Sequence, residues 1–287
     1  MRHLIAGLSL LATPLQAEPV AVVTDIAPVA ALVAEVQAGR GTVAALLGSD
    51  ADPHNVTLRP SEARALQSAG LIVWIGPELT PWMATALDRL APGAPRLGLL
   101  DLAVTQRQAR ADEGHGHEDG REDGRGFDPH AWLDPDNAAG WLPLVAEALA
   151  DADPDGAAHY RARARAAARE LQAIAGPSVA AGTVYLAEHD SLAYAEAALG
   201  MTFAGALSDA DGQAPGAAHL AELVERAGDT GAGCLVHERA RPGPAARQFA
   251  ADLGLTLVAV DILGAEIAPG GYVAWFARLG TDLGACP

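Results

Sequence analysis

The chain has 287 residues, of which 50% are hydrophobic and 5% are aromatic, and its formal net charge is −17. This length suggests about two domains, with ample apolar material for their cores. The acidic balance argues against nucleic acid and anionic membrane surfaces as partners, because both attract basic faces. It fits a protein that handles cations, with an ordinary solvated acidic surface as the alternative explanation.

Residues 1–17 have the pattern of a secretory signal peptide. A basic start at Arg2 and His3 precedes an apolar segment at 4–12, and a cleavage site follows at Ala17. The apolar segment is too short to cross a bilayer, and no later segment approaches the ~20 apolar residues required. We therefore expect a mature chain of residues 18–287, soluble in an oxidising compartment and without a lipid anchor.

The two cysteines of the chain are Cys234 and Cys286. In a secreted chain an even number of cysteines favours a disulfide. This bridge would close a loop of about fifty residues, which the loop-entropy model values at on the order of 4 kcal/mol. The alternative is a pair of metal thiolates, although their spacing does not suit a zinc knuckle.

Apolar runs alternate with helical patterns along the whole chain, which predicts an α/β fold with mainly parallel sheets. The expected strands are 19–24, 42–47, 71–75, 96–100, 183–187, 201–207, 233–236 and 255–260. The expected helices are 27–38, 60–69, 81–90, 136–150, 154–175, 191–199, 215–227, 244–253 and 271–283. Ser191 is the expected N-cap of its helix.

One predicted helix is unusually long. About twenty residues from Pro154 onward would extend on the order of 30 Å, roughly the width of a domain. We interpret residues 153–176 as a connecting helix. It would join an N-terminal α/β lobe at 18–152 to a C-terminal α/β lobe at 177–287, each with about four strands.

Residues 106–126 interrupt the N-terminal lobe and have almost no apolar character. Glycines alternate there with acidic residues and with His115 and His117. This composition predicts a flexible, solvated loop. The two histidines are candidates for auxiliary metal capture, and a loop that is merely solvated is the alternative.

The segment 127–135 contains the strongest candidate ligand. His130 follows Pro129 and is flanked by acidic residues, and a shorter Asp-Pro-His segment at 52–54 contains His54. Each proline restricts its own backbone and that of the preceding residue, so these loops are partly pre-formed. Two such segments in one chain suggest two parts of one site.

Further candidate ligands follow predicted strands, where parallel α/β sheets bind their ligands. These are His189 and Asp261, with His237 and Glu238 in reserve. Taken singly, each could be a turn residue or a strand cap. Together with the two loop histidines, His189 and Asp261 would form a closed four-coordinate Zn²⁺ site, which holds a metal rather than activating water.

On these motifs the chain resembles the solute-binding proteins of ABC-type metal uptake systems, in the zinc-specific branch (ZnuA/AztC-like). The resemblance rests on the segments 52–55, 128–135 and 189–194, the His/acid-rich insert and the late Asp261. It implies two (β/α)4 lobes joined by one long rigid helix, with the metal in the interlobe cleft.

The resemblance also implies roles for individual residues. The metal ligands would be His54, His130, His189 and Asp261. The manganese branch of the family has Glu in place of His189, so this histidine favours zinc. The cysteine pair is similar to the C-terminal disulfide of zinc-binding members.

The function implied by the resemblance is that of a periplasmic receptor, not an enzyme. It would bind Zn²⁺ and deliver it to a cognate ABC permease, act as a monomer, and have a periplasmic zinc metallochaperone as a candidate further partner. The alternatives are a manganese receptor, an adhesin-like surface protein of the same fold, and a secreted metallohydrolase. The hydrolase would need Glu188 or Glu238 as a base, and the chain has no His-Glu-x-x-His motif.

Overall fold

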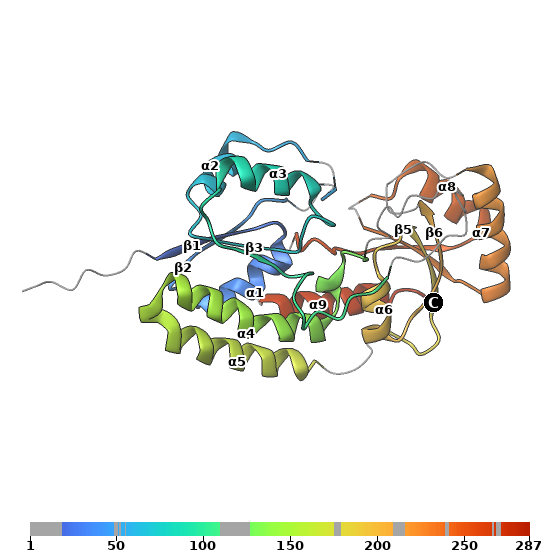
Figure 1. Cartoon of the computed structure of the whole chain (residues 1–287). Coiled ribbons are helices and arrows are strands. Elements are labelled where there is room, and N and C mark those ends of the chain that lie inside the picture. Colours follow the sequence, from blue (N-terminus) through green and yellow to red (C-terminus); the bar gives the residue numbers. More distant parts are fainter. Residues whose placement is uncertain are drawn as a thin grey trace, which may run out of the picture.

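A computed structural model describes most of the chain and contains two α/β lobes (Figure 1). The described residues are 19–48, 51, 53–54, 56–109, 127–174, 179–208, 216–238, 241–265, 267 and 271–287. The predicted signal peptide, most of the insert at 106–126, and both of its histidines lie outside this set.

The N-terminal lobe is built on a parallel four-stranded sheet in the order β2-β1-β3-β4. Its strands are β1 (Val20–Thr24), β2 (Gly41–Ala45), β3 (Leu71–Trp74) and β4 (Arg96–Gly98). Its helices are α1 (Ala27–Gln37), α2 (Pro60–Gln67), α3 (Pro81–Leu90) and α4 (Pro135–Ala152). Successive side chains of a strand face opposite layers, so Val23 packs with α2 and α3, whereas Val22 packs on the side of α1 and α4.

The C-terminal lobe repeats this plan, with the parallel order β6-β5-β7-β8. Its strands are β5 (Val184–His189), β6 (Thr202–Ser208), β7 (Cys234–His237) and β8 (Thr256–Ala259). Its helices are α6 (Ala193–Leu199), α7 (Ala217–Thr230), α8 (Pro244–Leu253) and α9 (Gly271–Leu283). Leu186 and Leu235 pack against α7 and α8, while Tyr185 and Val236 face the other side. The prediction of two similar parallel α/β lobes is confirmed.

The two lobes share one hydrophobic core. A single cluster of buried residues includes Val29 and Trp141 of the N-terminal lobe together with Tyr185 and Trp275 of the C-terminal lobe. Helix α9 packs directly against α1, and Figure 1 shows it reaching from α1 toward the C-terminal lobe. The lobes are therefore held together by packing as well as by the chain that connects them.

The helix expected to connect the lobes is shorter than predicted. The segment begins with a 3₁₀ turn at Pro154–Gly156, and α5 spans Ala157–Gln172, 16 residues. The carboxylate of Asp153 accepts a hydrogen bond from Gly156 N at 3.2 Å and another from the Tyr160 hydroxyl at 2.6 Å, which stabilises this tight start. Helix α5 packs along α4 and α1 of the N-terminal lobe. The domain limits at 152–153 and 176–177 stay predictions.

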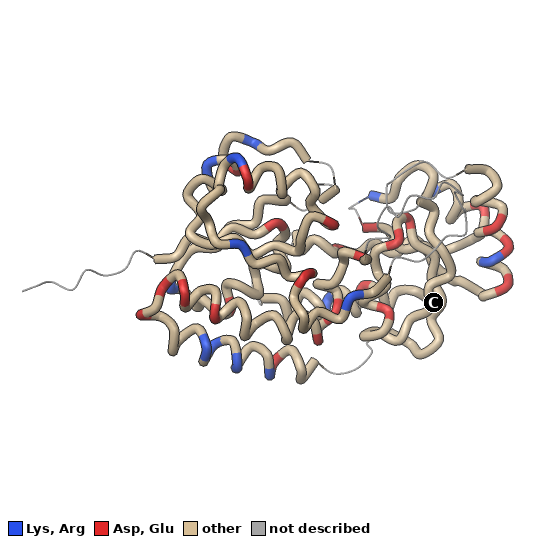
Figure 2. The backbone as a smooth tube through the Cα atoms, in the orientation of Figure 1, with Lys and Arg blue, Asp and Glu red and all other residues tan. Residues whose placement is uncertain are grey.

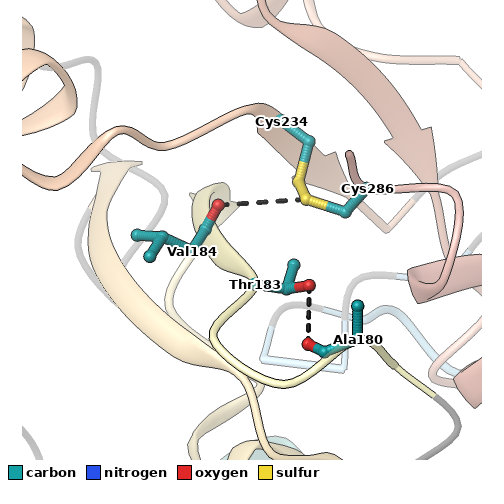
Figure 3. Close-up of a disulfide and its surroundings, with 5 residues drawn as sticks. All are labelled: Ala180, Thr183, Val184, Cys234 and Cys286. Carbon is teal, nitrogen blue, oxygen red and sulfur yellow. Dashed lines mark hydrogen bonds between the residues drawn. A yellow bond between two sulfur atoms is a disulfide. The ribbon is translucent and has the colours of Figure 1, made fainter.

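The predicted disulfide between Cys234 and Cys286 is confirmed (Figure 3). The two Cα atoms are 5.4 Å apart and the cysteines are 52 residues apart in sequence. The bridge joins β7, a central strand of the C-terminal sheet, to the segment that follows α9. Sγ of Cys286 also lies 3.9 Å from the carbonyl oxygen of Val184 in β5.

The acidic residues are spread over both lobes, whereas α5 carries a row of basic residues (Figure 2). Two of these arginines pair with acids on neighbouring helices: Arg161 with Glu147 at 2.6 Å, and Arg163 with Glu35 at 3.2 Å. Exposed pairs of this kind contribute little stability. Within the described residues, no helix combines the length and the apolar character needed to cross a membrane.

Candidate metal centre

Three histidines from three separate segments meet between the lobes. His54, His130 and His189 each offer a ring nitrogen, and these nitrogens lie within 4.8 Å of one another. Their ring centroids are 5.6 to 6.2 Å apart. Two of the rings come from the N-terminal lobe and one from the C-terminal lobe. The structure therefore brings together three of the four residues that the sequence analysis named as metal ligands.

His54 lies on the loop between β2 and α2. The start of this loop continues the sheet, because Leu46 N and Leu47 N donate to the carbonyl oxygens of Thr24 and Asp25, both at 2.9 Å. The indole of Trp82 on α3 donates to the Pro53 carbonyl at 2.9 Å. The backbone beside His54 is thus attached to the lobe at both of these points.

His130 is almost fully buried, with 2% of its surface exposed. Nδ1 of its ring lies 2.6 Å from Oδ1 of Asp128, and the same oxygen accepts the backbone N–H of His130 at 2.9 Å. The role of Asp128 was missed in the sequence analysis. The signal was present, since an Asp two residues before another residue commonly accepts that residue's N–H in a turn.

His189 is the last residue of β5, and its Nδ1 lies 3.2 Å from Oε1 of Glu238, which directly follows β7. Burial lowers the pKa of His189, but the hydrogen bond and charge of Glu238, with the charges of Asp190 and Asp128, outweigh it and raise the pKa overall. Nε2 of His189 is buried and has no hydrogen-bond partner among the described residues. This nitrogen is therefore the one available to a metal.

Glu238 receives a second hydrogen bond, from the hydroxyl of Ser191. The prediction that Ser191 caps its helix is wrong, because α6 begins at Ala193 and Leu192 occupies the N-cap position without a side-chain bond. Burial raises the pKa of Glu238, but the bond to His189, the charges of His189 and His130, and the bond from Ser191 together lower it. Glu238 is therefore held as a carboxylate beside the histidine group.

Asp261 and His237 are not among the residues whose ligand atoms meet within 4.8 Å. Asp261 follows β8, is partly buried, and its carbonyl oxygen accepts a hydrogen bond from the Trp275 indole at 2.8 Å. Its role as the fourth ligand stays a prediction. His237 is buried at the end of β7, and strand alternation turns it toward α7 and α8, away from the three histidines.

Hydrogen bonds between the lobes hold the segments next to the histidines in place. The indole of Trp132 donates to the Ile262 carbonyl at 2.9 Å, next to Asp261. The Tyr272 hydroxyl of α9 donates to the Trp132 carbonyl at 2.6 Å. The ring of Trp132 also contacts that of His130, with centroids 5.2 Å apart. The positions of His130 and of the Asp261 loop are thus coupled through one tryptophan.

The geometry suits a cation with nitrogen ligands. Zinc–nitrogen bonds of about 2.1 Å in a tetrahedral arrangement place two nitrogens about 3.4 Å apart. Ring nitrogens that already lie within 4.8 Å of one another need only small side-chain adjustments to reach that spacing. Imidazole ligands suit zinc and other borderline cations, whereas manganese, magnesium and calcium prefer oxygen.

The fold and the histidine group together define a two-lobed metal-binding protein. The chain belongs to the family "Zinc-uptake complex component A periplasmic" (ZnuA), which matches residues 22–286. The high-affinity zinc uptake system protein ZnuA of Paracoccus denitrificans is 36% identical over 263 residues, covering 82% of this chain and 81% of that protein.

Solved structures share the fold. A crystal structure of ZnuA superposes with a TM-score of 0.78 at 19% identity, covering 93% of this chain and 98% of the other. The solute-binding protein FpvC of Pseudomonas aeruginosa, in complex with Mn²⁺, superposes with a TM-score of 0.75 at 17% identity, covering 93% and 97%. Because a manganese complex has this fold too, the metal must be argued from the ligands.

Proposed function

We propose that the protein is a periplasmic receptor that binds Zn²⁺ between its lobes and delivers it to the permease of an ABC importer. The ligands are His54, His130, His189 and Asp261. The convergence of three imidazoles from both lobes is the observation that carries this proposal. The similarity to a protein named as part of a high-affinity zinc uptake system supports it.

The donor set favours zinc as the cargo. Three imidazoles form a site that ranks zinc well above manganese in the general order of divalent affinities. With Asp261 as the fourth ligand, the first shell would have no open position, as in sites that hold zinc rather than use it for hydrolysis. Such a site would bind the metal as cargo without using it for chemistry.

The test is a competitive metal titration of the metal-stripped mature chain, followed by tryptophan fluorescence. Trp132 is the natural reporter, because its ring contacts that of His130. We expect one tight equivalent of Zn²⁺, much weaker binding of Mn²⁺, and loss of tight binding in His189→Ala. In Asp261→Ala we expect a smaller loss, since three imidazoles remain.

Two results would contradict the proposal. Absence of a tight zinc site would mean that the ligand set is wrong. Equal affinity for manganese would place the chain in a different functional branch. A His219→Ala variant is the matched control, because His219 lies on α7, where Nε2 is bonded to the Ala206 carbonyl at 2.8 Å.

The acidic insert and the partners belong to the same proposal. We infer that His115 and His117 capture metal weakly or accept it from a metallochaperone, and that the receptor works as a monomer. Deletion of residues 112–125 should then slow zinc loading from a chaperone without changing the final affinity. An unchanged loading rate would remove this role for the insert.

A further inference from the structure

Two of the three histidines each have a carboxylate beside the ring, although the carboxylate is placed by different contacts in each case. In His130 and in His189, Nδ1 lies against a carboxylate, at 2.6 Å from Asp128 and 3.2 Å from Glu238. We propose that Asp128 and Glu238 are a pair of positioning residues, one for each lobe, that hold these two rings with Nε2 toward the bound metal. This inference rests on the zinc-binding function proposed above.

Several contacts within the protein hold Asp128 in place. It is 6% exposed, and its Oδ1 accepts both the backbone N–H and the ring Nδ1 of His130. The Tyr194 hydroxyl, from α6 of the C-terminal lobe, donates to the Asp128 carbonyl at 3.0 Å and accepts from Gln108 N at 2.8 Å. Asp128 is therefore fixed from both lobes, and the ring that it holds can turn very little.

Glu238 is placed by the order of the strands. It follows β7, which pairs directly with β5, so its carboxylate comes beside His189, although 49 residues separate the two in sequence. Ser191 donates to the same oxygen, Oε1, that His189 approaches. The hydroxyl restricts the rotation of Glu238, which in turn restricts the imidazole.

The arrangement also selects the protonation state that a metal ligand needs. A neutral imidazole with Nδ1 against a carboxylate carries its proton on Nδ1, which leaves the lone pair on Nε2. In His189 this Nε2 is buried and lacks any hydrogen-bond partner in the described part of the chain. A buried acceptor without a partner is costly, and a metal ion would satisfy it.

The two carboxylates also place negative charge close to the ion without using a coordination position. A doubly charged cation in a buried site needs compensation, and outer carboxylates supply it while raising the basicity of the imidazoles. One such group stands on each lobe. Each half of the site therefore contributes negative charge close to the ion.

The test compares four variants of the mature chain: Asp128→Ala, Asp128→Asn, Glu238→Ala and Glu238→Gln. We expect each alanine variant to bind Zn²⁺ 10–100-fold more weakly, the usual effect of losing such a partner. The amide variants should recover part of this loss, because their carbonyl oxygen still accepts the Nδ1 proton. Glu147→Ala is the control, since Glu147 is exposed and pairs with Arg161 on the helix surface.

A second measurement separates positioning from folding. In ¹⁵N NMR spectra of the metal-free protein, recorded at a pH at which the imidazole is neutral, His189 should carry its proton on Nδ1 in the native chain. In Glu238→Ala it should shift toward Nε2–H, the tautomer that free histidine prefers. Alanine variants with native zinc affinity and an unchanged tautomer would overturn the positioning role. Absence of zinc binding in the native chain itself would instead overturn the proposed function.

Discussion

At the scale of single residues, the buried carboxyl group of Asp25 has an unusual environment. It follows β1, is fully buried, and accepts hydrogen bonds from Ile26 N at 2.9 Å and Ile75 N at 2.8 Å. Burial raises its pKa from 3.8 to about 7, although these two backbone bonds act in the opposite direction. The carboxyl group therefore links β1, the start of α1 and the end of β3. Because it is buried, its ionised form is unfavourable in the folded protein.

The sign of the resulting pH effect follows from proton binding. Between pH 4 and 7 the unfolded chain has lost the Asp25 proton while the folded chain retains it, so unfolding releases a proton. The free energy of unfolding of the metal-free protein should then fall as pH rises through this range, by up to about 4 kcal/mol from this group. Above pH 7 its contribution should become constant.

The ¹³C chemical shift of the Asp25 carboxyl group measures this pKa directly. A titration midpoint near pH 4 would contradict the prediction. Chemical denaturation at several pH values gives the stability, and Asp25→Asn serves as the comparison, because an amide does not ionise. The unfolding free energy of Asp25→Asn should lack the fall that Asp25 causes between pH 4 and 7, even if the variant is less stable at every pH.

At the scale of secondary-structure elements, the disulfide fixes the segment after α9 to the centre of a sheet. The double variant Cys234→Ser/Cys286→Ser should lower the free energy of unfolding by about 4 kcal/mol, the loop-entropy value for a closure of this length. Denaturant unfolding of the metal-free protein, monitored by circular dichroism, measures the loss. Treating the native chain with a reductant should reproduce it. A stability that neither treatment changes would show that the bridge constrains little.

The helices and strands could largely be predicted from the sequence, whereas the contacts between them could not. Hydrophobic periodicity and turn-forming residues located the strands, because each strand is a short apolar run, such as Leu71–Trp74, bounded by polar or glycine-rich turns. Local patterns say nothing about strand order, so the sequence analysis named Glu238 only as a residue in reserve and left its contact with His189 open. The helix start at Ser191 failed for a similar reason, since its hydroxyl bonds to a distant carboxylate.

In the candidate site, too, the individual residues could be predicted but the contacts that orient them could not. Its histidines were identifiable because each stands on a stiff loop or directly at a strand end. The bonds that orient them, from Trp82, Asp128 and Tyr194, depend on how separate segments pack.

The connecting helix was predicted too long, because the pattern in an Ala-rich segment could not reveal that Asp153 stabilises a 3₁₀ turn ahead of α5.

At the scale of the whole molecule, the common core limits how far the lobes can separate. Helix α9 packs on α1, and Trp132 bonds to the backbone of the opposite lobe. We expect the radius of gyration, roughly 18 Å for a compact chain of this size, to change by less than about 5% when zinc is removed. Small-angle X-ray scattering of the zinc-loaded and metal-free forms measures this.

Hydrogen exchange should locate the response to zinc instead. Metal removal should speed exchange in the loop around His54 and near residues 127–130 more than in the helices of the shared core. A large expansion in scattering, with increased exchange in α1 and α9, would instead indicate a hinged opening of the lobes. The exchange of α7, which is distant from the histidines, provides the internal reference.

The position of α9 has a consequence for how the protein is made. This helix follows all the other described elements in the chain, yet its buried residues, among them Tyr272, Trp275 and Phe276, complete the core that both lobes share. During translation, the N-terminal lobe emerges with the face of α1 that α9 will cover still open to solvent. A nonsense product that stops before residue 271 would keep that face exposed, and cellular proteases should remove it.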